Sequence, residues 1–270
     1  MFICRFIHRE EKPSTIFIQK EVVKEVEQVL REIGFDAGEN IKDTAVKVAG
    51  NIHKKEFRKF WLEHLKLDTW KLHVLEEGYK LPFLTPPDRY IEGNNQSSKK
   101  ELPFLKDEGS KLLEKGVISR VDSRPHCCPP LTVACRTLVN GKVKKRHCID
   151  LSWKVNKDLI REGVKLTTIQ KSFQLLEREN LQATYDLSSA YHHIKIHPDH
   201  KKYLGFCVPG PEGDEFYQFE CMPFGLASAT KCLARITKPI CAFLAKKGIR
   251  HSCTSMTERS MWLRRTSSDT

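Results

Sequence analysis

The sequence predicts an α+β fold, because amphipathic helical segments dominate its first part and short strands with turns dominate its second part. The chain has 270 residues, of which 40% are hydrophobic, so it is long enough to bury a sizeable core. One large domain or two smaller ones are both compatible with this length. A long helical segment is expected after the strands.

Two amphipathic helices are expected in residues 1–80, which we interpret as a mainly helical N-terminal region. In residues 19–33 the apolar positions recur at helical spacing, and Gly34 follows where a C-cap would stand. Residues 54–66 carry aromatic and aliphatic side chains on one side and Lys, Arg and His on the other. We interpret the aromatic side as core; the basic side is either a solvated face or a phosphate contact.

Residues 81–100 are rich in Pro, Gly, Asn and Ser, a composition that predicts a linker or extended arm. A third helix is expected over residues 101–115, followed by a strand over residues 117–121. Strands over residues 129–135 and 143–151 flank an Asn-Gly turn, which predicts a β-hairpin. Its cations are Lys142, Lys144, Lys145 and Arg146. They suit a triphosphate or a nucleic-acid backbone, and a merely solvated hairpin is equally compatible with the pattern.

Residues 183–194 place one carboxylate, Asp186, at the end of an expected strand, after an expected helix over residues 168–177. Tyr191 follows at the start of a helical turn. Two further strands are expected over residues 203–208 and 216–221, then a helix over residues 227–247 that is broken or bent near Pro239. Between Lys231 and Arg250 there are six Lys and Arg residues and no acidic one, which suits a template backbone.

The formal net charge is +12, with basic residues mixed among aromatic ones, and this favours nucleic acid as partner over an acidic small molecule. A soluble surface that is basic for no specific reason is the alternative. The ten cysteines are irregularly spaced and follow no cleavable signal peptide, so we expect reduced thiols in a cytoplasmic or nuclear, intracellular protein. No apolar run approaches the roughly 20 residues of a membrane span, and no membrane segment is expected.

Two other interpretations compete at this point. A carboxylate at a strand end most often caps a helix or accepts a turn hydrogen bond. A metal-binding module is suggested by four clustered histidines and an upstream group, namely His192, His193, His197, His200 and His126-Cys127-Cys128. No C-x-x-C pair accompanies them, and the spacing fits no zinc knuckle or finger.

Several motifs occur in a fixed order over residues 101–250. They are Leu112-Leu113-Glu114-Lys115-Gly116-Val117-Ile118, Pro130-Leu131-Thr132-Val133, Arg146 through Asn156, Asp186 through Ile194, His197-Pro198, Lys202 through Phe206, Tyr217-Gln218-Phe219 and Met222 through Ala229. Together they resemble a reverse transcriptase (RNA-directed DNA polymerase) of the gypsy-like and DIRS-like retrotransposons. Residues 1–100 match this family only loosely, through Gly78-Tyr79-Lys80-Leu81-Pro82-Phe83.

The resemblance implies a partial right-hand polymerase, with fingers over residues 101–165 and an incomplete palm over residues 166–252. It implies that Asp186 is the first ligand of two catalytic Mg²⁺ ions, with the Leu187 carbonyl beside it. Tyr191 would be the steric gate at the ribose 2′-hydroxyl, and Arg146 would contact the incoming triphosphate, helped by Lys142 or Lys145. Phe224 and Gly225 would lie under the nascent base pair and template. The implied partners are an RNA/DNA primer-template and a dNTP, joined by two-metal phosphoryl transfer.

Three residues depart from the family pattern. Ser152 stands where the family has Arg, Thr230 stands where it has Pro, and Leu233 stands where it usually has Phe. The spacing between Asp150 and Asn156 is also one residue longer than in the family. The register of the fingers and the start of the long helix are therefore open.

The family's second metal motif, Tyr-x-Asp-Asp, is missing after residues 248–252. If the reading frame skips the first two bases of codon 253, the last base of the Met256 codon and the first two bases of the Thr257 codon form an Asp codon. With permitted codons for the residues before them, the shifted frame spells Tyr-Ile-Asp-Asp. We therefore hypothesise that residues 253–270 are an out-of-frame tail. Because one carboxylate cannot hold two Mg²⁺ ions, the chain is expected to be an inactive fragment with an open palm-sheet edge and poor solubility. A non-catalytic nucleic-acid-binding pseudoenzyme of the same fold is the alternative.

Overall fold

A computed structural model describes residues 24–35, 49–164, 182–185, 189–255 and 259–265. The expected helix over residues 168–177 and the expected site residues Asp186 and Leu187 lie outside these ranges. The described part of the chain contains both helices and strands, in an order that follows the sequence patterns closely.

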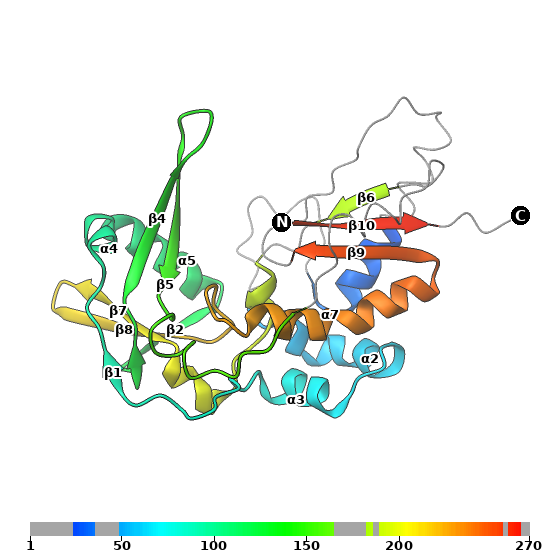
Figure 1. Ribbon diagram of the computed structural model, residues 1–270, viewed down its shortest axis with the longest axis horizontal. Coiled ribbons are helices and arrows are strands. Elements are labelled where there is room, and N and C mark those ends of the chain that lie inside the picture. Colours follow the sequence, from blue (N-terminus) through cyan, green and yellow to red (C-terminus); the bar gives the residue numbers. More distant parts are fainter. Residues whose placement is uncertain (1–23, 36–48, 165–181, 186–188, 256–258, 266–270) are drawn as a thin grey trace, which may run out of the picture.

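Figure 1 shows two groups of elements that are joined through the middle of the chain. The first group comprises α4 (Gln96–Lys100), α5 (Leu102–Glu114), β2 (Ile118–Val121), β4 (Leu131–Thr137), β5 (Val143–Ile149), β7 (Gly205–Gly210) and β8 (Gly213–Phe219). The second comprises α2 (Lys55–His64), α3 (Thr69–Glu77), β6 (Gln182–Tyr185), α7 (Ala229–Lys246), β9 (Ile249–Ser255) and β10 (Arg259–Arg265). Three short 3-10 turns complete the described elements: η1 (Asn51–His53), η2 (Ala190–His193) and η3 (Pro198–Tyr203).

In the first group, β2, β8 and β7 form an antiparallel sheet in that order. The β4–β5 hairpin is antiparallel, with Leu131 opposite Ile149 and Thr137 opposite Val143, and its tip stands clear of the body in Figure 1. Two short strands, β1 (Tyr90–Ile91) and β3 (Cys127–Cys128), pair in parallel. The predicted hairpins and the helix before them are confirmed, because strand alternation and turn residues agree at these positions.

In the second group, β10 lies between β6 and β9. Met261 is opposite Tyr185 on one side and opposite Cys253 on the other. The sequence led us to expect that β6 would lack a hairpin partner, and this expectation is wrong, because β9 and β10 form the hairpin and β10 covers the β6 edge. The hypothesis of a shifted reading frame concerns the nucleotides and stays a prediction.

Helix α7 runs without interruption through Pro239, so a break there is wrong, and a bend there, the other expected form, stays a prediction. Proline removes one helical hydrogen bond, but packing holds the helix on both sides of it. Leu233, Ile236, Ile240 and Leu244 are all buried in the core. Leu233, one of the three residues that depart from the motif pattern, therefore fills a core position.

The N-terminal region shares its core with the rest of the described chain. The helix over residues 24–32 and α2 confirm the two predicted helices, and Gly34 takes the positive φ of 85° that a C-cap needs. The core residues of these helices and of α3 join those of α5 and α7 in one cluster. The backbone N–H of Tyr79 also donates to the carbonyl of Lys195 at 2.8 Å.

Residues 81–100 do not form a free linker. Asn94 donates to the Cys207 carbonyl at 2.9 Å and accepts from the backbone N–H of Leu131 at 2.9 Å. The buried Ser98 hydroxyl donates to the Leu131 carbonyl at 2.8 Å. Polar residues that favour irregular structure thus satisfy the edge of β4, which would otherwise expose unpaired backbone groups.

Candidate nucleic-acid interface

One face of the β4–β5 hairpin carries three cations. The register places Arg136 opposite Lys144 and Ala134 opposite Arg146, and all three cations are exposed. Side chains alternate between the two faces of a hairpin, so Arg136, Lys144 and Arg146 share one face, which we call the hairpin face. Its other residues are Thr132, Ala134 and Cys148, and none of them is acidic. Like charges in opposite positions destabilise a hairpin, so this face favours an anionic partner.

Lys145 lies on the other face of the hairpin. Its ammonium group donates to the Glu101 carboxylate at 2.6 Å, at the start of α5. The resemblance offered Lys142 or Lys145 as the companion of Arg146. The alternation of β5 instead puts Lys144 beside Arg146, while Lys142 is exposed in the turn, where its backbone N–H donates to the Asn140 side chain at 3.1 Å.

Asn156 ties the chain after β5 to the chain before α7. Its side-chain amide donates to the Gly225 carbonyl at 2.8 Å and accepts from the backbone N–H of Ala227 at 2.8 Å. Gly225 has a φ of 91°, and a Cβ there would lie 3.3 Å from the Ile149 carbonyl oxygen. The positive φ therefore favours glycine, and a Cβ would also require the Ile149 carbonyl to shift slightly.

Replacing Asn156 by Ala should lower the free energy of unfolding by about 1–2 kcal/mol, because two hydrogen bonds that join distant segments are lost together, each contributing about 0.5–1.5 kcal/mol. Asn156→Asp keeps the acceptor and should cost less. Urea unfolding measures both. The matched control is Asn140→Ala, whose side chain makes one exposed turn hydrogen bond; an equal loss in the two alanine variants would contradict a special role for Asn156.

Phe224 is held between Tyr191 and His192 in η2. Its ring centroid lies 5.2 Å from that of Tyr191 and 5.4 Å from that of His192, both edge to face, a favourable aromatic geometry. The Tyr191 hydroxyl lies 3.1 Å from the Thr230 hydroxyl. Thr230, one of the departures from the family, thus supplies a hydrogen bond that proline lacks, and burial raises the pKa of Tyr191.

This arrangement bears on the steric gate that the resemblance implies. Tyr191 is only 3% exposed, whereas Phe224 is 45% exposed and lies against it. The exposed aromatic surface at this place therefore belongs to Phe224. A gate role for Tyr191 stays a prediction, and it requires Phe224 to move when a nucleotide binds.

The strand that leads to Asp186 is present as β6, which ends at Tyr185. On the other side of Asp186, Ser189 has a φ of 53°, the one positive φ of a non-glycine residue among the described residues. Asp186 and Leu187 themselves lie outside the described ranges, so their binding of Mg²⁺ stays a prediction. Within the described ranges, no group of three or more His, Cys, Asp or Glu is placed to hold a metal ion.

The clustered histidines have other partners in the fold. His200 accepts from the backbone N–H of Leu81 at 3.0 Å, and His197 accepts from that of Asp199 at 3.3 Å. His192 is buried against Phe224. These contacts give the histidines structural roles and offer no support for a metal-binding module.

Trp153 is a candidate contact that the motifs did not single out. It is 74% exposed, in the turn between β5 and Asn156. Trp153 follows β5 of the hairpin in the chain. Asn156, at the end of the same turn, is hydrogen-bonded to the segment that carries Phe224, so the turn links the hairpin to both exposed aromatic residues. Exposed aromatic rings near cations are typical of surfaces that stack on unpaired bases. The signal for Trp153 in the sequence is an aromatic residue between two polar ones, Ser152 and Lys154.

The chain is similar to segments of plant-virus polyproteins. It is 29% identical over 154 residues to an enzymatic polyprotein of Cestrum yellow leaf curling virus, a match that covers 57% of this chain and 23% of that protein. It is 35% identical over 72 residues to the genome polyprotein of Petunia vein clearing virus (isolate Shepherd), covering 25% of this chain and 3% of that protein. The chain thus spans a small part of these relatives. No family model matches it.

Two further expectations can be compared with the described residues. Eight cysteines of the described ranges form no disulfide, namely Cys127, Cys128, Cys135, Cys148, Cys207, Cys221, Cys232 and Cys241. Among the helices of the described ranges, none combines the length and the apolar character that crossing a membrane requires.

Proposed function

We propose that this chain is a segment of a retroelement polyprotein with the fingers and incomplete palm of a reverse transcriptase. In this proposal it binds an RNA/DNA primer-template and does not extend the primer by itself. The observation that carries the proposal is the hairpin face, a strand face that presents Arg136, Lys144 and Arg146, on a chain with motifs in polymerase order. The similarity to viral polyproteins supports the same class.

In this proposal, the cations and the aromatic residues contact different parts of the nucleic acid. Arg136, Lys144 and Arg146 contact phosphates, which fixes position but reads no sequence. Trp153 and Phe224 provide ring faces for unpaired template bases. In a complete enzyme, Mg²⁺ supplies charge neutralisation during phosphoryl transfer. Asp186 and Leu187 are the residues of this chain proposed to hold it.

Primer-template binding tests the proposal. The wild-type chain should bind a fluorescent RNA/DNA primer-template with an affinity that falls steeply between about 50 and 200 mM salt, because bound cations release counterions. The double variant Arg136→Glu/Lys144→Glu should bind at least about tenfold more weakly, and its log–log salt slope should be smaller by about two. Fluorescence anisotropy measures both quantities.

The matched control is Lys66→Glu/Lys106→Glu, which makes the same charge change at two exposed lysines that do not belong to β4 or β5. It should keep most of the affinity. If the two double variants lose affinity equally, the binding comes from net charge alone and the hairpin face is not the interface.

Trp153→Ala should weaken binding to a primer-template with a single-stranded template overhang by about 1–3 kcal/mol, the usual contribution of one stacked base. Binding to a blunt duplex should change little, because its bases are already stacked. Comparing the two substrates by anisotropy checks the prediction, and an equal loss on both would rule out stacking by Trp153.

A further inference from the structure

A pocket of about 400 Å³ lies between η1, α2 and α3, in the part of the chain to which the proposed function assigns no role. Its volume falls within the range of ligand pockets in proteins. Six of its ten lining residues are apolar, namely Ile52, Trp61, Leu62, Leu67, Leu72 and Leu75. The remaining lining residues are His53, Lys55, Arg58 and Glu76.

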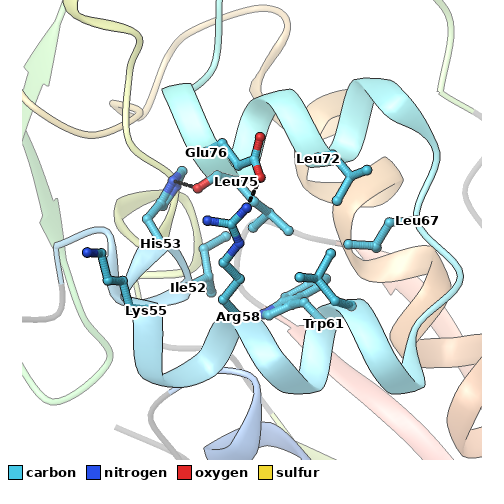
Figure 2. A pocket seen from close by; sticks show the side chains of 10 residues that line it. Ile52, His53, Lys55, Arg58, Trp61, Leu67, Leu72, Leu75 and Glu76 are labelled. Atoms are coloured by element: carbon cyan, nitrogen blue, oxygen red, sulfur yellow. Dashed lines mark hydrogen bonds and ion pairs between the residues drawn. The ribbon is translucent and has the colours of Figure 1, made fainter.

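Apolar and polar groups occupy different ends of this pocket. Figure 2 shows Trp61, Leu67 and Leu72 at one end and His53 and Lys55 at the other, with Arg58 reaching toward Glu76 between them. A ligand that fills this space therefore meets an apolar environment at one end and a polar one at the other. Such a distribution suits an amphiphile.

Two of the polar lining groups are already satisfied by the protein. The Trp61 indole N–H donates to the Ile33 carbonyl at 3.0 Å. The two ring nitrogens of His53 bond to the Leu75 carbonyl and to the backbone N–H of Lys195, each at 2.9 Å. Burial lowers the pKa of His53 to about 4, so the ring is neutral at pH 7. These side chains form walls, and neither offers a ligand a hydrogen bond or a charge.

The charges at the pocket are Lys55, Arg58 and Glu76, which sum to one positive charge. Arg58 and Glu76 form an ion pair, but their side chains are 55% and 39% exposed. An exposed pair of this kind contributes little stability, so a ligand anion can compete for the guanidinium group. Lys55 is exposed and forms no ion pair with the described residues. The lining charge therefore favours a ligand with one negative charge.

We propose that this pocket binds a monoanionic amphiphile, with its apolar chain among Trp61, Leu67 and Leu72 and its carboxylate at Lys55 and Arg58. The site is independent of the hairpin face, because none of its lining residues belongs to β4 or β5. Loss of nucleic-acid binding would therefore leave this proposal standing, and the reverse also holds.

Titration of the full chain with sodium decanoate tests the proposal, with isothermal calorimetry as readout. Decanoate should bind saturably, and octanoate should bind about tenfold more weakly because it buries two fewer methylene groups. Decylammonium should bind at least about fivefold more weakly than decanoate, since its charge is repelled at Lys55 and Arg58.

Variants locate the binding. Lys55→Glu should weaken decanoate binding about fivefold, while Lys59→Glu, the same change on α2 at a residue outside the lining, should leave it unchanged. Leu72→Phe should weaken it about tenfold by filling the apolar end. Leu62→Asp, at a half-exposed position that tolerates a polar side chain, tests the same lining if Leu72→Phe does not fold. Absence of decanoate binding, equal binding of decylammonium, or equal effects of the two lysine variants would overturn the proposal.

Discussion

The free energy of unfolding is expected to fall steeply as the pH drops from 6.5 to about 4. Three histidines, His53, His147 and His192, are held neutral, because burial lowers the pKa of each from 6.5 to about 4. The unfolded chain binds protons at these residues in this window and the folded chain does not. Their contribution is fully present above pH 6.5 and is lost as the pH approaches the folded-state pKa.

At about pH 4, each of these histidines should have lowered the free energy of unfolding by about 2–3 kcal/mol relative to its value at pH 6.5. Urea unfolding at a series of pH values measures the loss. The His147 ring is stacked on Phe219 and tilted against Phe206, so His147→Phe should preserve the packing and reduce the proton uptake on unfolding by about one. A flat stability profile between pH 6.5 and 4.5 would contradict the account of the three buried rings.

Trp61→Ala should lower the free energy of unfolding by about 3–5 kcal/mol, enough to unfold a chain of ordinary stability. Trp61 is 1% exposed, and its indole hydrogen bond to Ile33 joins α2 to the helix over residues 24–32. The substitution therefore removes a large apolar side chain and leaves a buried carbonyl without its donor. Thermal and urea unfolding measure the effect.

Trp153→Ala is the control for this prediction, since it removes the same side chain at a position that is 74% exposed. It should change stability by no more than about 0.5 kcal/mol. Trp61→Phe should lie between the two, because it keeps most of the packing and loses the hydrogen bond. Equal losses in the two alanine variants would mean that the N-terminal helices do not share the core.

Local patterns in the sequence predicted most of the elements. Periodicity and turn residues gave α2, α5, both hairpins and α7. They did not give α3, because the apolar residues Trp70, Leu72, Val74 and Leu75 follow no single stripe. The fold explains why: Val74 is buried in the core, while Trp70 lies under the guanidinium of Arg235 at 4.0 Å. A helix covered from two directions shows weak amphipathic periodicity.

The candidate interface was predictable only in part. The sequence identified the cations of the hairpin, but the resemblance implied Lys142 or Lys145 as the companion of Arg146, whereas the alternation of β5 places Lys144 on the face of Arg146. The roles of Asn156 and Thr230 rest on contacts between segments far apart in the chain. The composition around Asn94 and Ser98 predicts a linker. Their hydrogen bonds to the backbone of Leu131 at the edge of β4 could not be predicted, because such contacts leave no local pattern in the sequence.

Primer extension on an RNA template tests the central claim most directly. Purified chain, an annealed DNA primer, dNTPs and Mg²⁺ are combined under low-salt conditions in which anisotropy shows the primer-template to be bound. The account predicts binding without extension, because the chain lacks the Tyr-x-Asp-Asp carboxylates that would share the two metal ions with Asp186. Processive Mg²⁺-dependent synthesis that Asp186→Ala abolishes would contradict it.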